Sequence, residues 1–153
     1  MKPTMPCIFC RIVAKEIPAS IIYEDEKTLG FLDHLPVSRG HTLVILKEHH
    51  ESLVDIPPQG LKDLIRITQK LSRAAVKAMK ADGFNLIMNN GRSAGQEVFH
   101  AHFHVIPRFL GDGLRIGLPR NRYREEEVKE IQTALLRELS SESDPGTAVA
   151  STP

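Results

Sequence analysis

The sequence has few of the features that define secreted, membrane or nucleic-acid-binding proteins. It has no tryptophan, only 5% aromatic residues and only two cysteines, which argues against a disulfide framework. No apolar run approaches the ~20 residues of a membrane span, and Met1–Pro6 lacks the apolar stretch of a signal peptide. The formal net charge is only +1, so charge alone favours neither a nucleic acid nor a lipid surface. We therefore expect a cytoplasmic protein with neither a membrane nor a nucleic acid as its partner.

The residues that are present suffice for one globular domain. The chain has 153 residues, of which 41% are hydrophobic, and a chain of this kind buries a core without staples. Apolar residues at three- and four-residue spacing predict a long helix and a C-terminal helix, and alternating or apolar runs predict strands. The helices are expected over residues 8–15, 59–81 and 125–139, and the strands over 21–24, 28–33, 41–47, 84–89 and 98–108.

Strands that follow one another through short turns favour an antiparallel sheet and an α+β class. Residues 1–139 are expected to form the domain. Residues 140–153 are small and polar, and we expect them to be a disordered tail.

The most informative segment is residues 100–106, H-A-H-F-H-V-I. On a strand, His100, His102 and His104 would share one face, while the residues between them would be buried on the other. The histidines could be chance surface residues, or they could bind a metal, although three such positions span about 13 Å. They could also serve covalent catalysis, because a neutral imidazole with a pKa of about 6.5 is a good nucleophile near neutral pH.

Cys7 and Cys10 form a C-x-x-C pair. A redox pair is expected at a helix start in a βαβ setting, which the pattern does not show, and two plain thiols are equally compatible with the pair alone. A closed zinc site needs two more ligands, and His49, His50 and His100 are the candidates.

The segment at residues 100–106 resembles the signature of the histidine-triad (HIT) family, in which histidines alternate with hydrophobic residues. Other segments resemble the Hint-like, prokaryotic branch, and together they cover residues 7–108: Cys7–Ile12 with Glu16–Ala19, Phe31–Asp33 with Gly40–Ile45, and Asn89–Gly91 with Gly95–Phe99. The resemblance implies a HIT-like fold, which is a five-stranded antiparallel sheet with helices, and a homodimer.

The resemblance also implies roles for individual residues. His102 would be the nucleophile, His104 would contact the phosphate, and His41 would complete the catalytic site. Asp33 would hold the ribose hydroxyls. The other implied nucleotide contacts are Asn89 and apolar walls from Ile8, Phe9, Ile12 and Phe31, which without the resemblance would be ordinary core residues. Backbone N–H groups of the Asn90–Gln96 turn could also contact the phosphate. Some prokaryotic members bind structural zinc through residues that match Cys7, Cys10, His49 and His100.

The implied activity is hydrolysis at the α-phosphate of a purine nucleoside phosphoramidate or a dinucleotide polyphosphate, with no catalytic metal. One departure is Glu97, which stands where many relatives carry a serine or threonine that touches the phosphate. The alternatives are a nucleotidyl transferase, a zinc-stabilised nucleotide-binding module with little turnover, and a zinc hydrolase with the triad as ligands.

Overall fold

The computed structural model describes residues 7–142 and divides them into two units, the first ending at Asp112 and the second beginning at Gly113. The first unit is a five-stranded sheet in the order β1-β2-β3-β5-β4, with every neighbouring pair antiparallel. Its strands are β1 (Ile21–Glu24), β2 (Thr28–Leu32), β3 (Thr42–Leu46), β4 (Gly83–Ile87) and β5 (His102–Arg108). The predicted α+β class and five-stranded antiparallel sheet are confirmed.

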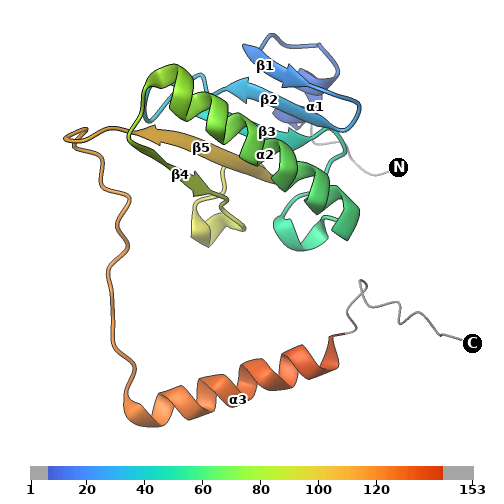
Figure 1. Ribbon diagram of the computed structural model, residues 1–153. Helices are drawn as coiled ribbons and strands as arrows, with labels where there is room; N and C mark the ends of the chain where they lie inside the picture. The colour runs from blue at the N-terminus through green and yellow to red at the C-terminus, as the bar shows by residue number, and fades with distance from the viewer. Residues whose placement is uncertain (1–6, 143–153) are drawn as a thin grey trace, which may run out of the picture. The chain divides into compact units, whose positions relative to one another are not determined.

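Two helices cover opposite faces of this sheet (Figure 1). On one face α2 (Pro58–Met79) packs Leu64, Ile67 and Leu71 against Val44 and Val105. On the other face the short helix α1 (Ile8–Val13) packs its buried side chains into a second cluster. All five residues of β3 are buried as a result, as expected for a central strand covered on both faces. The remaining elements of this unit are two 3₁₀ helices, η1 (Leu53–Asp55) and η2 (Arg92–Ala94).

The last strand begins later than predicted, at His102 instead of residue 98. The Ala101 N–H donates to the His50 carbonyl (N···O 2.7 Å), and the His100 N–H turns back to the Val98 carbonyl (2.9 Å). These two groups are therefore not available to the sheet. The prediction that His100 lies on the strand is wrong, whereas Phe103 and Val105 do pack on the α2 face as predicted.

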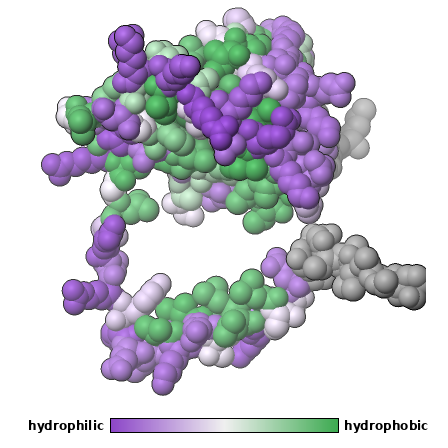
Figure 2. Space-filling view, viewed as in Figure 1, coloured by the Kyte–Doolittle hydropathy of each residue, from purple (hydrophilic) through white to green (hydrophobic). Residues whose placement is uncertain are grey.

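The second unit contains α3 (Glu125–Ser141), which extends two residues beyond the predicted end at 139. The prediction of disorder is therefore wrong for residues 140 and 141, and residues 143–153 lie outside the described part of the chain. A hydrophobic band runs along this helix (Figure 2) and includes Val128, Ile131 and Leu135. Between residues 7 and 142, no helix combines the length and apolar character needed to cross a bilayer.

Candidate active site

The geometry around His102 leaves one ring nitrogen free to act as a nucleophile. His102 is the first residue of β5 and pairs with Ile45 of β3. Its Nδ1 lies 2.6 Å from the His100 carbonyl. A carbonyl oxygen only accepts, so Nδ1 carries the proton, and a neutral imidazole has only one. The lone pair of His102 is therefore on Nε2.

His104 has the opposite tautomer because a chain of hydrogen bonds fixes it. The Val37 N–H donates to His41 Nδ1 (3.0 Å), which places the His41 proton on Nε2. His41 Nε2 then donates to His104 Nδ1 (3.0 Å), and the His104 proton is left on Nε2. The rings of His102 and His104 are 4.8 Å apart between centroids. One ring thus offers a lone pair, and the neighbouring ring offers an N–H donor.

Burial keeps these histidines neutral. It lowers the pKa of His102 below the ordinary 6.5, against an opposing effect of its bond to the His100 carbonyl. Burial, with His102 and His41 nearby, lowers the pKa of His104 to about 4. The pKa of His41 is lowered by burial too, although Asp33 opposes this. All three rings are therefore uncharged near neutral pH, and His102 keeps its lone pair.

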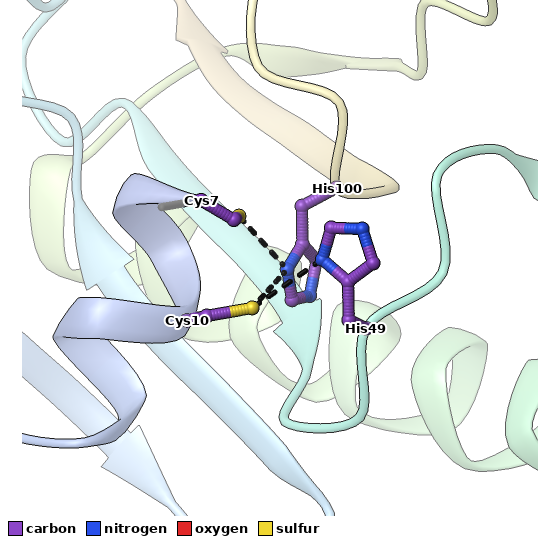
Figure 3. Close-up of side chains that lie close together, drawn as sticks. All are labelled: Cys7, Cys10, His49 and His100. Atoms are coloured by element: carbon purple, nitrogen blue, oxygen red, sulfur yellow. Dashed lines mark hydrogen bonds between the residues drawn. The ribbon is translucent and has the colours of Figure 1, made fainter. Parts of the chain in front are cut away.

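A second cluster joins two cysteines and two histidines that come from distant parts of the sequence (Figure 3). Cys10 Sγ lies 3.3 Å from His49 Nδ1 and 3.6 Å from His100 Nδ1, and Cys7 Sγ lies 3.5 Å from His100 Nδ1. Ligand atoms on a tetrahedral zinc ion, with bonds of about 2.3 Å to sulfur and 2.0–2.1 Å to nitrogen, are about 3.6 Å apart. The spacing of the four side chains therefore fits one zinc ion.

The protonation of His100 also suits a metal ligand. Its Nε2 donates to the Leu46 carbonyl (2.8 Å), so its Nδ1 lone pair faces the sulfurs. Burial and the neighbouring Cys7 raise the pKa of the Cys10 thiol to about 11, and a bound cation would reverse this by stabilising the thiolate. His50, the other candidate ligand, lies beside Glu48 instead (3.7 Å).

Comparison with known protein families gives a match to the HIT domain over residues 14–111. The chain belongs to the HIT family. The family and fold that the residues around the triad predicted are both confirmed.

Individual relatives agree with this assignment. A HIT-like protein of Methanocaldococcus jannaschii is 46% identical, covering 82% of this chain and 98% of that protein. The adenosine 5′-monophosphoramidase HNT1 of Saccharomyces cerevisiae is 40% identical, covering 87% of this chain and 82% of that protein. The crystal structure of a Zn-bound histidine triad family protein from Mycobacterium smegmatis has a TM-score of 0.70 and 44% identity, covering 91% of this chain and 99% of that one.

The HIT fold brings Phe9, one of the predicted nucleotide-contacting residues, against the ring of His102. The Phe9 ring lies 5.4 Å from Phe31 and 5.1 Å from His102, between centroids. Ile12 is buried in the same α1 cluster, whereas Ile8 is 44% exposed. The apolar wall therefore centres on the two phenylalanines.

The predicted polar contacts differ in how free their side chains are. Asp33 accepts from the Leu35 N–H with Oδ1 (2.9 Å), while its Oδ2 lies 3.7 Å from His41 Nε2. The Asn89 side chain makes one long bond, of 3.5 Å, to the Gly95 carbonyl. Gln96 is different, because its amide oxygen and nitrogen are both bonded within the protein. The structure thus leaves Asp33 and Asn89 available to a ligand and engages Gln96 internally.

The triad does not form a three-histidine metal site. Within residues 7–142, the metal-compatible groups place His100 with the cysteines and His104 with Asp33 and His41. In the latter group the Val37 N–H donates to His41 Nδ1, so the His41 proton is on Nε2. A metal ion at Nε2 would need a lone pair there instead of a proton. Hydrogen bonding accounts for this group without a metal.

Proposed function

We propose that this HIT protein hydrolyses a purine nucleoside phosphoramidate or a dinucleotide polyphosphate at the α-phosphate. The observation that supports this proposal is the pair of opposite tautomers, with a lone pair on His102 Nε2 and a proton on His104 Nε2. The name of the yeast relative, a monophosphoramidase, supports the same class of reaction.

In the first step His102 Nε2 forms a bond to the α-phosphorus, and the bond from phosphorus to the leaving group breaks. The N–H of His104 Nε2 donates a hydrogen bond to a phosphate oxygen, which stabilises the charge that develops there, and the leaving group takes its proton from water. The nucleotidyl-imidazole is positively charged, and its Nδ1–H bond to the His100 carbonyl, 2.6 Å long, stabilises that charge. In the second step water attacks phosphorus and loses a proton to the solvent, the bond from phosphorus to His102 Nε2 breaks, and the nucleoside monophosphate is released.

The proposal includes a structural zinc ion held by Cys7, Cys10, His49 and His100, whose atoms fit its coordination. Zinc would fasten α1 to the sheet, and it takes no part in the two steps above.

A homodimer is also part of the proposal. The edge strand β4 supports it, since Phe84 and Leu86 are 45% and 40% exposed. The cytoplasm is the proposed location.

The proposed function is tested by intact-protein mass spectrometry after rapid mixing with an adenosine phosphoramidate. A transient gain of one adenylyl mass together with release of AMP is expected. Transfer of the nucleotidyl group to an added phosphorylated acceptor, instead of to water, would favour a nucleotidyl transferase. Tight nucleotide binding with neither adduct nor AMP, also with guanosine and dinucleotide substrates, would favour a binding module.

The lowered pKa of His102 predicts the pH dependence of the first step. Protonation removes the attacking lone pair, and burial shifts that protonation to a pH below 6.5. The rate of adduct formation is therefore expected to stay constant from about pH 8 to about pH 6.5 and to fall only in more acidic solution. Quenched-flow measurement of the adduct checks this, and a decline centred at or above the ordinary histidine pKa would contradict it.

A further inference from the structure

We propose that Gln96 is a positioning residue, whose side-chain amide holds the His100–Ala101 peptide in the orientation that fixes the tautomer of His102. The inference rests on the proposed function, since it concerns the same nucleophile and assigns no new reaction. It gives Gln96 a role inside the protein in place of a contact to the nucleotide.

Gln96 is 5% exposed, and its side chain joins three parts of the backbone. Its Oε1 accepts from the Gly91 N–H (2.8 Å), and its Nε2 donates to the Glu51 carbonyl (2.6 Å) and the Val98 carbonyl (3.1 Å). Both amide N–H groups are thus engaged by carbonyls. The side chain links the turn before the triad to the segment that follows zinc-cluster residue His49.

Of the two carbonyl-bearing segments, one holds the N–H of the His100–Ala101 peptide and the other holds the N–H of the peptide just before it. The Val98 carbonyl accepts the His100 N–H (2.9 Å) in addition to the Gln96 amide. The residue before Glu51, His50, accepts the Ala101 N–H with its own carbonyl (2.7 Å). Gln96 therefore connects the segment that holds the Ala101 N–H to the segment that holds the His100 N–H, one peptide earlier.

The His100–Ala101 peptide is trans and planar, so its N–H and C=O groups point in opposite directions. While the Ala101 N–H is held by the His50 carbonyl, the His100 carbonyl must point the other way. There it accepts from His102 Nδ1 at 2.6 Å. A rotation of this peptide would remove the acceptor that keeps the His102 proton on Nδ1, and the lone pair would no longer be confined to Nε2.

Two variants at this position separate positioning from substrate contact. Gln96→Glu keeps the size of the side chain and the acceptor for Gly91 but removes both N–H donors, and Gln96→Leu removes all three bonds. The control is Gln59→Leu, at an exposed position of α2 where the amide makes one bond, of 3.4 Å, to Asp63. Equal thermal unfolding of Gln96→Glu and wild type establishes that the variant is folded.

Both Gln96 variants are expected to lower kcat by about tenfold to a hundredfold, because a small misplacement of a reacting group has effects of that size. KM is expected to stay within about twofold of wild type, and Gln59→Leu should match wild type in both. A raised KM with unchanged kcat would show instead that Gln96 contacts the substrate and would overturn the proposal.

The tautomer itself is measured by ¹⁵N NMR of the histidine side chains without substrate. Wild type is expected to show His102 as a single species protonated on Nδ1, and Gln96→Glu to show a mixture of both tautomers. An unchanged His102 tautomer in Gln96→Glu would overturn the proposal even if kcat fell. Because this measurement needs no turnover, it decides the role of Gln96 even if the proposed hydrolysis fails.

Discussion

Replacement of His102 by alanine is expected to abolish nucleotide turnover, with a loss on the order of 10⁴- to 10⁶-fold in kcat. His102 has its lone pair on Nε2 and lies beside the His104 donor, and it would form the covalent bond to phosphorus. His104 cannot replace it, since its own proton is held on Nε2 by the bond from His41 to its Nδ1. The adenylyl adduct should disappear together with turnover.

The measurement is rapid-mix mass spectrometry of wild type, His102→Ala and His102→Gly, with proteolysis to locate the adduct. The matched control is His34→Ala, because the His34 side chain is 87% exposed. Added imidazole should restore part of the activity of His102→Gly by occupying the vacated space. An adduct that persists in folded His102→Ala, or maps outside β5, would rule out this nucleophile.

Several parts of the fold follow from side-chain patterns that the sequence displays. Apolar spacing predicted α2 within two residues at each end of its observed span, Pro58–Met79. The helix ends with Lys80 at φ 53°, so a lysine adopts the left-handed conformation before the predicted stop at Asp82 and Gly83. Alternation likewise placed Phe103 and Val105 on the buried face of β5.

The position of His100 could not be predicted in this way, because backbone contacts between distant segments determine it. Its departure from β5 depends on the His50 carbonyl, which captures the Ala101 N–H. A period-two pattern treats His100, His102 and His104 alike, whereas the fold gives His100 to the cysteine cluster and leaves the other two side by side.

The tautomers of the site lay beyond sequence reasoning for the same reason. The groups that set them are the Val37 N–H, the Leu46 carbonyl and the His100 carbonyl. Every residue except proline has both groups, so their partners have no side-chain signature in the sequence. The family resemblance could therefore name the reacting histidines, but only the structure gives the nitrogen that each one presents.

Loss of a zinc ligand is expected to have the largest effect on stability. Helix α1 has only six residues, too few to be stable alone, and it carries Cys10 together with Phe9, whose ring contacts His102. Without the metal, α1 would be held only by its buried apolar side chains. Cys10→Ser is therefore expected to lower the melting temperature by about 10 °C or more, and to weaken nucleotide binding because Phe9 moves with the helix.

Metal analysis and calorimetry of the purified protein check this prediction. Wild type and His34→Ala should each contain one zinc ion per chain, whereas Cys10→Ser and His49→Ala should contain little, and a strong chelator should reduce wild type to their melting temperature. Wild type purified without zinc, or a Cys10→Ser variant that unfolds at the wild-type temperature, would contradict a structural zinc site.

Because the metal takes no part in the two chemical steps, zinc-depleted protein that remains folded should still form the adduct on His102. Loss of zinc should therefore raise KM and lower the melting temperature, while the rate of adduct formation changes little. A zinc hydrolase would instead lose that rate at once on removal of the metal, while the protein is still folded.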